Sequence, residues 1–403
     1  MAMEPNSNPL VQPARNARTV AAIDIGANSL RMVVAEVLPD GNVEVLERVQ
    51  RAVRLGQDTF RRGRMGAASM RAAVAILRDY KELLNLYQVE RVRAVATSAV
   101  REASNGDTFL DRVFVATGLK VEVIGTSEES RLAVSAVRRV LRNTPGGQES
   151  QTLIADVGGG STLLTILLAQ EIVTSQSLRL GSIRLQEILS TAEDAPRRSA
   201  ELLRYHISNA ISAVVHSLPL KGIQSFLAVG GDARFAARQI GKPTDSEDLV
   251  IIDPIEFDKL VDRCEEYTAE ELSKRYGLPF AEAETLNPAL LVYQNLFRLT
   301  QAREILVSHV SMRDGLLLEL ARAVTGQEDQ SLLEGVIHSA TAIVQKYRAD
   351  LRHARIVADL ALRLFDELQA EHGLGTRQRL LLQVAGLLHE IGGFVINRSH
   401  HKH

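Results

Sequence analysis

One short pattern occurs twice in this chain: a buried strand, a glycine turn headed by an aspartate, and a second buried strand. The first copy covers residues 19–37 around DIGANS, and the second covers residues 152–169 around DVGGGST. The shared offsets are held by Asp24, Gly26 and Ser29 in the first copy and by Asp156, Gly158 and Ser161 in the second. An internal duplication leaves such self-similarity, but turn-rich hairpins also recur by chance, so the pattern leaves both explanations open.

Helical and strand patterns alternate around the two hairpins. Apolar residues recur at helical spacing over residues 70–87, and short apolar strands follow at 92–96 and 121–124. A further strand, in FLAVGGDARFAARQ, runs through Gly230 and Gly231 into a helical pattern. Alternating strands and helices of this kind predict an α/β core.

Composition narrows the classes of function. The 403 residues predict two or three domains, and the 45% hydrophobic and 24% charged content is ordinary for globular proteins. A net charge of -2, 4% aromatic residues and no tryptophan argue against a specific nucleic-acid partner. No apolar run approaches the ~20 residues that cross a bilayer, so no membrane partner is expected. Residues 1–18 predict a disordered leader, and the single Cys264 fits a reducing compartment, which indicates a cytoplasmic protein.

The two glycine turns form a candidate phosphate site. Glycine has no Cβ, so successive backbone N–H groups can approach an anion closely. The candidate donors are the N–H groups of Gly158, Gly159 and Gly160 and the hydroxyls of Ser29, Ser161 and Thr162. Asp24 and Asp156 offer oxygen ligands for Mg²⁺, which bridges phosphates and offsets their charge. The alternative is that both loops are ordinary tight turns capped by aspartate.

Charged residues follow two of the predicted strands. Glu128 and Glu129 stand at the start of a predicted helix, where Thr126 and Glu129 match a capping box. One of these glutamates is either a helix cap or a general base that orients an attacking water. Arg101 either clamps phosphate oxygens or pairs with a surface carboxylate.

Beyond about Thr325 the patterns are helical only, which predicts a separate all-α domain. His353, His389 and Glu390 in this part have side chains that bind metals. Partly exposed helix histidines are the alternative interpretation.

Several collinear motifs give the chain a resemblance to a known family. They are AAIDIGANSLRMVVAEV, VRLG, VRAVATSAVREASN, EVIGTSEESRL, ADVGGGST, LRLGSIRL and VSMRDGLL. In this order they resemble the exopolyphosphatase/guanosine pentaphosphate phosphatase (Ppx/GppA) family of the actin-like ATPase superfamily. The resemblance implies an α/β fold with two actin-like (ribonuclease H-like) domains around a cleft, expected over residues 19–133 and 134–324. An all-α HD-like helical domain is expected over residues 331–403.

The resemblance also implies a reaction: hydrolysis of the terminal phosphate of inorganic polyphosphate or of guanosine pentaphosphate with Mg²⁺, by a homodimer. The positions that match the family's three phosphate loops are Asp24, Gly26, Asn28 and Ser29, then Asp156, Gly158, Gly159, Gly160, Ser161 and Thr162, then Gly230 and Gly231. Arg101 matches a phosphate contact. Glu129, with Glu128 as the less favoured neighbour, matches the glutamate that activates water.

The chain departs from the family pattern inside the loops. Leu163 stands where the family's GGGSTE has its glutamate, and Ala27 stands where a serine is frequent. Val229 and Asp232 replace the two threonines of GTGGT. Leucine binds neither Mg²⁺ nor water, and loss of one carboxylate from an electrostatic site costs about 2–4 kcal/mol of transition-state stabilisation.

We therefore predict a Mg²⁺-dependent exopolyphosphatase, with Leu163 as the feature that points to impaired activity. The alternatives are a guanosine pentaphosphate (pppGpp) 5'-phosphohydrolase and a non-catalytic polyphosphate- or alarmone-binding regulator. In the HD-like part, Glu390 replaces an aspartate and no later ligand follows. A truncated domain with a vestigial metal site at His353, His389 and Glu390 is expected there.

Overall fold

The computed structural model describes residues 17–141, 151–189, 195–215, 218, 220–326 and 349–394, with further positions between 333 and 347. Residues 1–16 of the predicted leader and parts of the all-α domain predicted over residues 331–403 lie outside the described residues. The chain forms two compact units, residues 1–326 and 327–403.

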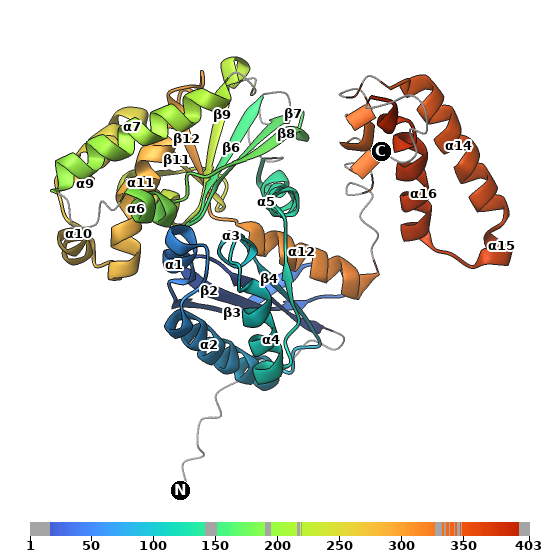
Figure 1. Cartoon of the computed structure of the whole chain (residues 1–403), viewed down its shortest axis with the longest axis horizontal. Coiled ribbons are helices and arrows are strands. Elements are labelled where there is room, and N and C mark those ends of the chain that lie inside the picture. Colours follow the sequence, from blue (N-terminus) through green and yellow to red (C-terminus); the bar gives the residue numbers. More distant parts are fainter. Residues whose placement is uncertain are drawn as a thin grey trace, which may run out of the picture. The chain divides into compact units, whose positions relative to one another are not determined.

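The first sheet of unit 1 has five strands. They are β1 (Arg18–Ile25), β2 (Ser29–Val37), β3 (Val43–Ala52), β4 (Arg91–Ala96) and β5 (Val121–Val123), in the order β3-β2-β1-β4-β5. The helices between them are α1 (Leu55–Arg62), α2 (Ala67–Leu86), α3 (Ser98–Arg101) and α4 (Gly106–Thr117). Helices α2 and α4 cover one face of the sheet (Figure 1). The apolar stripe predicted over residues 70–87 faces this sheet, with Leu77 and Ala73 fully buried.

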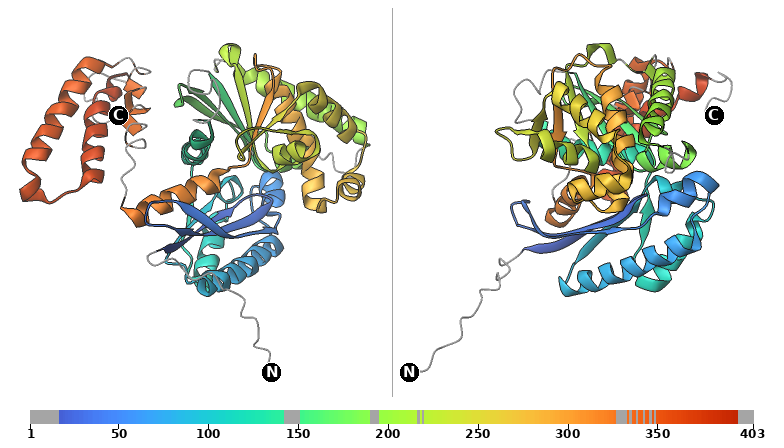
Figure 2. Two further views of the ribbon diagram at one scale, coloured as in Figure 1. Left: turned by 180° about the vertical axis from the view of Figure 1, so that it is seen from behind. Right: turned by 90° about the vertical axis from the view of Figure 1, so that its left-hand side faces the viewer.

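The second sheet of unit 1 has seven strands. They are β6 (Thr152–Val157), β7 (Thr162–Leu168), β8 (Glu171–Leu178), β9 (Ser225–Val229), β10 (Lys242–Pro243), β11 (Leu249–Ile252) and β12 (Ile305–Ser308), in the order β10-β11-β12-β9-β6-β7-β8. The helices are α5 (Thr126–Leu141), α6 (Ser182–Leu189), α7 (Pro196–Val215), α8 (Gly231–Ile240), α9 (Pro254–Cys264), α10 (Ala269–Tyr276) and α11 (Phe280–Phe297), with a 3₁₀ turn η2 (Leu220–Gly222). Helices α7, α9 and α11 lie on one face and α5 on the other (Figures 1 and 2).

The two sheets share one topology. In the first, β1 pairs antiparallel with β2 and parallel with β4, and β4 pairs parallel with β5. In the second, β6 pairs antiparallel with β7 and parallel with β9, and β9 pairs parallel with β12. Five strands thus repeat in the same order and the same directions. This agreement favours internal duplication over chance recurrence of a hairpin.

Two helices join the halves of unit 1. Helix α12 (Met312–Thr325) falls almost wholly within the range predicted for the second domain, 134–324, yet it packs on the first sheet (Figure 2). The reason is its apolar face, because Leu316 and Leu317 cluster with Val20 on β1. At Gly315 α12 crosses α5 so closely that an added Cβ would lie 2.1 Å from a backbone oxygen of α5. The sequence boundary near residue 133 therefore separates the sheets but not the helices that cover them.

Unit 2 is helical, as predicted. Its described elements are α14 (Leu351–Glu367), α15 (Gln369–His372), α16 (Thr376–Leu388) and a 3₁₀ turn η3 (Ile391–Phe394). Gly373 takes a left-handed conformation with φ 60° and ends α15. Helices α14 and α16 pack together, with Gly386 against Ala358. None of the helices in the described ranges is long and apolar enough to cross a membrane.

Candidate active site

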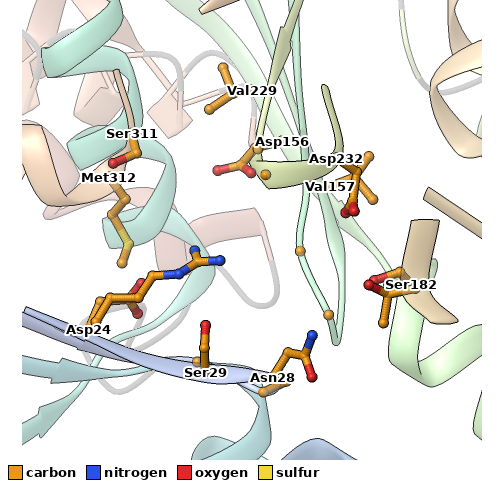
Figure 3. A pocket seen from close by; sticks show the side chains of 18 of the residues that line it. Asp24, Asn28, Ser29, Asp156, Val157, Ser182, Val229, Asp232, Ser311 and Met312 are labelled. Atoms are coloured by element: carbon orange, nitrogen blue, oxygen red, sulfur yellow. The ribbon is translucent and has the colours of Figure 1, made fainter. Parts of the chain in front are cut away.

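A cavity of about 360 Å³ opens where the two glycine turns of unit 1 meet. Figure 3 shows the first turn, with Asn28 and Ser29, facing Asp156 on β6 and Asp232 at the start of α8. The predicted residues that line this cavity are Asp24, Gly26, Asn28, Ser29, Glu129, Asp156, Gly158, Gly159, Gly160, Ser161, Gly230 and Gly231. Residues far apart in the sequence thus meet in one space, because most of them lie where strands of the two matching sheets end, and Glu129 lies in the first turn of α5.

The two turns have the same hydrogen bonds. The N–H of Gly26 donates to the Ser29 carbonyl at 3.1 Å, and the N–H of Gly158 donates to the Ser161 carbonyl at 2.9 Å. These two amides are therefore engaged within their turns and do not serve an anion. The candidate backbone donors to an anion are therefore the N–H groups of the residues that follow them. Of these residues, Gly159 and Gly160 line the cavity.

Two predicted phosphate ligands have other partners. The hydroxyl of Thr162 is fully buried and donates to the Leu180 carbonyl at 2.8 Å, away from the cavity. The side-chain amide of Asn28 donates to the Ala281 carbonyl at 2.9 Å, which ties the first turn to α11. Its Oδ1 is buried and has no hydrogen-bond partner among the described residues. Asn28 therefore presents an acceptor, which suits a cation or a water better than a phosphate.

Glycine at position 160 is required by packing. A Cβ there would lie 2.2 Å from the Ser98 hydroxyl and 2.4 Å from the Phe60 ring. The carbonyl of Gly160 accepts a hydrogen bond at 2.6 Å from Arg184, whose guanidinium also lies 4.1 Å from the centre of the Phe60 ring. Arg184 is almost fully buried and pairs with Glu102 at 2.6 Å. The motif LRLGSIRL contains this arginine, but sequence analysis did not identify its role.

Asp156 lies between two apolar neighbours in the sheet. The β6–β7 register places it opposite Leu163, and the β6–β9 register places it opposite Val229. Residues directly opposite on adjacent strands point to the same face, so both apolar side chains border the carboxyl group. Burial raises the pKa of Asp156 to about 7, and the negative charge of Glu129 adds to the effect while Arg234 opposes it. Two of the departures from the family pattern are thus the two strand neighbours of one aspartate.

Glu129 and Glu128 have different surroundings. Glu129, in the first turn of α5, lines the cavity and accepts a 2.5 Å hydrogen bond from Arg101, and burial raises its pKa. Glu128 is absent from the cavity lining and accepts hydrogen bonds from Arg131 at 2.6 and 2.8 Å and from Arg93 at 3.0 Å. The Arg131 bonds lower the pKa of Glu128. Of the two adjacent glutamates, only Glu129 faces the site.

Arg101 does not line the cavity in this structure. One of its guanidinium nitrogens donates to the Ile124 carbonyl at 2.6 Å as well as to Glu129. The prediction that Arg101 contacts phosphate therefore stays a prediction, while the structure gives this side chain a contact that positions Glu129.

Four arginines that sequence analysis did not single out line the cavity: Arg31, Arg234, Arg313 and the exposed Arg238. Among the described residues none of them makes an ion pair within 4.0 Å, and one Nη of Arg234 is buried with no hydrogen-bond partner. Burial and the neighbouring arginines lower the pKa of Arg313 to about 10. Arg31 and Arg313 stand in quoted motifs, NSLRMVV and VSMRDG, so their position in those motifs was the available signal.

The third loop brings a further carboxylate to the cavity. Gly230 has φ 137°, and a Cβ there would lie 2.7 Å from the hydroxyl of Tyr293, so glycine is required. Two residues later, Asp232 lines the cavity at the start of α8. Burial raises its pKa to about 7, and Arg31 is the main opposing charge.

The predicted metal ligands of unit 2 also converge. His353 lies in the first turn of α14, while His389 and Glu390 follow α16. One ligating atom from each lies within 4.8 Å of the other two. These residues belong to the second unit and take no part in the cavity of the first.

The fold and the cavity define a class: an α/β protein with two actin-like halves whose strand-end loops meet around an oxygen-rich, arginine-lined site. Residues 32–323 match the Ppx/GppA phosphatase family, and residues 337–403 match domain III of the Ppx/GppA phosphatases. The chain belongs to the Ppx/GppA phosphatase family, whose members hydrolyse phosphoanhydride bonds.

Individual relatives agree with this family. A guanosine-5'-triphosphate,3'-diphosphate pyrophosphatase from Photobacterium profundum is 24% identical over 373 residues, which are 92% of this chain and 72% of the relative. The crystal structure of the Aquifex aeolicus Ppx/GppA family member is 26% identical and has a TM-score of 0.61, over 78% of this chain and 100% of that one. An exopolyphosphatase from Cytophaga hutchinsonii shares the fold, at 21% identity and a TM-score of 0.68, over 76% of this chain and 98% of that one.

Proposed function

We propose that this phosphatase removes the terminal phosphate of inorganic polyphosphate. The observation that carries the proposal is the cluster of Arg31, Arg234 and Arg313, which face one cavity without ion-pair partners among the described residues. Burial lowers the pKa of Arg313, and repulsion from the neighbouring Arg31 and Arg234 lowers it further. A chain of phosphates supplies several negative charges in a row and relieves the repulsion at all three arginines.

In this proposal Glu129 is the general base. Its carboxylate lines the cavity, and burial raises its pKa toward the range in which a carboxylate accepts a proton from water effectively. Arg101 holds one carboxylate oxygen and leaves the other to orient the attacking water. Phosphoryl transfer depends mainly on positioning and charge stabilisation, so one oriented water and a set of fixed cations are sufficient machinery.

The oxygen ligands at the cavity fit Mg²⁺. Asp24 and Asp156 would hold the ion, and the unpartnered Oδ1 of Asn28 is a third oxygen of the kind that Mg²⁺ prefers. When bound, Mg²⁺ supplies positive charge that offsets the charge of the phosphates. Without it, burial and the negative charge of Glu129 both raise the pKa of Asp156.

Hydrolysis of guanosine pentaphosphate is the second candidate, because the relative from Photobacterium profundum bears the name of that activity. Both substrates present a terminal phosphoanhydride to the same base. A third candidate is a regulator that binds the anion without turnover, which the apolar Leu163 beside Asp156 favours.

The test is phosphate release from long-chain polyphosphate and from guanosine pentaphosphate, each with Mg²⁺ and with excess chelator. We expect faster turnover of polyphosphate and its loss in Glu129→Gln. The matched control is Glu128→Gln, which changes the adjacent carboxylate outside the cavity and should keep turnover. Faster turnover of guanosine pentaphosphate would favour the second candidate, and binding of polyphosphate without turnover would favour the regulator.

A further inference from the structure

Arg184, in the first turn of α6, is the largest of the fully buried side chains in the described part of the chain. It does not line the cavity. A buried guanidinium is stable only where its charge and its N–H groups have partners. Its Nε donates to the Gly160 carbonyl at 2.6 Å, one Nη donates to Glu102 at 2.6 Å, and the group lies 4.1 Å from the centre of the Phe60 ring.

These contacts join the two halves of unit 1. Phe60 on α1 and Glu102 directly after α3 belong to the first half, whereas Gly160 lies in the second glycine turn. Helix α3 ends at Arg101, which bonds to Glu129. Adjacent residues at the end of one short helix therefore hold the proposed base and, through Arg184, the second glycine turn.

The start of α6 occupies every carbonyl of the glycine run. The first N–H groups of a helix have no partner within that helix, and here the turn supplies their partners. Gly181 allows this approach, because a Cβ there would lie 2.2 Å from the carbonyl carbon of Gly160. The bonds run from the N–H of Ser182 to Gly158 and from the N–H groups of Ile183 and Arg184 to Gly159, all at 3.0 Å, and from the Nε of Arg184 to Gly160.

The carbonyl contacts determine where the N–H groups of the turn point. The peptide bonds are trans, so the N–H of Ser161 points opposite to the carbonyl of Gly160, and the N–H groups of Gly159 and Gly160 point opposite to the carbonyls before them. Within the described ranges, none of these three N–H groups donates a hydrogen bond. Because all three residues line the cavity, contacts with α6 on one side of the turn leave three donors available to an anion on the other.

We propose that Arg184 is a positioning residue of the phosphatase site, which acts through the Gly160 carbonyl to keep the Ser161 N–H directed at a phosphate in the cavity. The carbonyl and this N–H belong to one planar peptide unit, so neither can turn without the other. Glycine restricts its backbone little, and without the Arg184 bond the peptide after Gly160 is free to rotate. The inference rests on the proposed function, because that function places a phosphate at these amides.

The test is NMR spectroscopy of the full chain during titration with inorganic phosphate in the presence of Mg²⁺. Only two serines in the sequence follow a glycine, Ser161 and Ser182. Labelling of glycine carbonyls with ¹³C and of serine nitrogens with ¹⁵N therefore selects the amide signals of these two peptides. The N–H of Ser182 is already bonded to Gly158, which makes it an internal reference. We expect phosphate to shift the Ser161 signal and to leave the Ser182 signal almost unchanged.

Arg184→Lys is the decisive variant. Lysine keeps the positive charge beside Glu102, but its single nitrogen cannot replace the two nitrogens that bond to Glu102 and Gly160. We expect most of the phosphate-induced shift of Ser161 to be lost, and kcat for polyphosphate to fall at least about tenfold with little change in KM, because a donor aimed at developing charge acts mainly in the transition state. The matched control is Arg179→Lys, since Arg179 pairs with the same Glu102 at 3.4 Å from an exposed position. It should change neither the shift nor kcat.

An unshifted Ser161 signal in the wild type, or an equal shift in Arg184→Lys, would overturn the proposal. A Ser161 shift that depends on Arg184, in a protein that does not turn over polyphosphate, would support the positioning role and contradict the proposed function, so the two failures are distinguishable. Circular dichroism checks that the variants fold. If Arg184→Lys unfolds, Glu102→Gln removes the charge that holds the guanidinium and carries the same test: a reduced Ser161 shift supports the proposal, and an unchanged shift contradicts it.

Discussion

Replacing Asp156 by asparagine should stabilise unit 1 above neutral pH, although it removes a residue of the candidate active site. The carboxyl group of Asp156 lies between Leu163 and Val229 in the sheet, and burial raises its pKa from 3.8 to about 7. The folded protein therefore favours the protonated form. Asparagine resembles that form in shape and carries no charge at any pH.

The sign and size of the effect follow from linkage. Because the folded pKa lies above the unfolded value, this group's contribution to stability is fully present below about pH 4 and is lost as the pH rises to about 7. At about 1.4 kcal/mol for each pH unit, the loss is at most about 4 kcal/mol. Asp156 lines a cavity that water enters, so screening reduces the expected gain in Asp156→Asn to about 1–3 kcal/mol.

The assay is thermal unfolding of the metal-free protein at about pH 8 and about pH 4.5. We expect Asp156→Asn to raise the midpoint by several degrees at the higher pH, at ~2–4 °C for each kcal/mol, and by much less at the lower pH. The control is Asp111→Asn on the exposed side of α4, which should change neither midpoint. An equal gain at both pH values, or no gain above neutral pH, would refute the reasoning.

Three further outcomes test the site and the fold. Leu163→Glu places a carboxylate opposite Asp156 on β6. We expect activation at lower Mg²⁺ concentration and at least tenfold faster phosphate release, which corresponds to about 1.4 kcal/mol. An unchanged rate would show that the family's glutamate is not needed here. Arg313→Gln should raise KM for long polyphosphate and make it less sensitive to salt; an equal loss for a short, singly charged phosphoester would contradict the cluster's role. Gly315→Ala should lower the free energy of unfolding in urea by about 1–3 kcal/mol because its Cβ meets α5, whereas Gly125→Ala, with open space around it, should not.

The parts of the site that the sequence predicted lie where a local pattern fixes the position. Asp24 and Asp156 end buried strands that are followed by glycine turns, and strand and turn together determine which way the next residues point. The matching offsets of the two turns became matching hydrogen bonds in the structure. Local rules were sufficient here because the turn is built from residues within a few positions of each other.

The choice between Glu128 and Glu129 needed more than the motif. Both begin α5, but Arg131 stands three residues after Glu128, and pairs at this spacing meet on a helix surface. That spacing was visible in the sequence and would have favoured Glu129. The contact of Glu129 with Arg101 was not visible, since it depends on how α3 and α5 pack.

The position of α12 and the arginine cluster were beyond local patterns. Helix α12 follows the last strand of the second sheet and returns to the first sheet because its apolar face completes that core. This return brings Arg313 to a cavity that also holds Arg31 from β2 and Arg234 from α8. The cluster exists only once both sheets and the returning helix are assembled, so no window of sequence contains it.

The cavity concentrates charges of both signs, and each set is unfavourable alone. Burial raises the pKa of Asp156 and of Asp232 to about 7, while burial and mutual repulsion lower that of Arg313 to about 10. The carboxylates and the arginines share one space, yet no carboxylate forms an ion pair with Arg313 or Arg234 within 4.0 Å among the described residues. In the proposed function, a divalent cation relieves the repulsion among the carboxylates and a polyphosphate relieves the repulsion among the arginines. The cation and the polyphosphate carry opposite charges and would lie side by side in the cavity. Binding of one should therefore strengthen binding of the other, by the same factor in both directions. The proposed preference for substrate and metal together then follows from how the empty cavity is charged. The same charge repulsion is the reason why we expect removal of one charge to stabilise the fold.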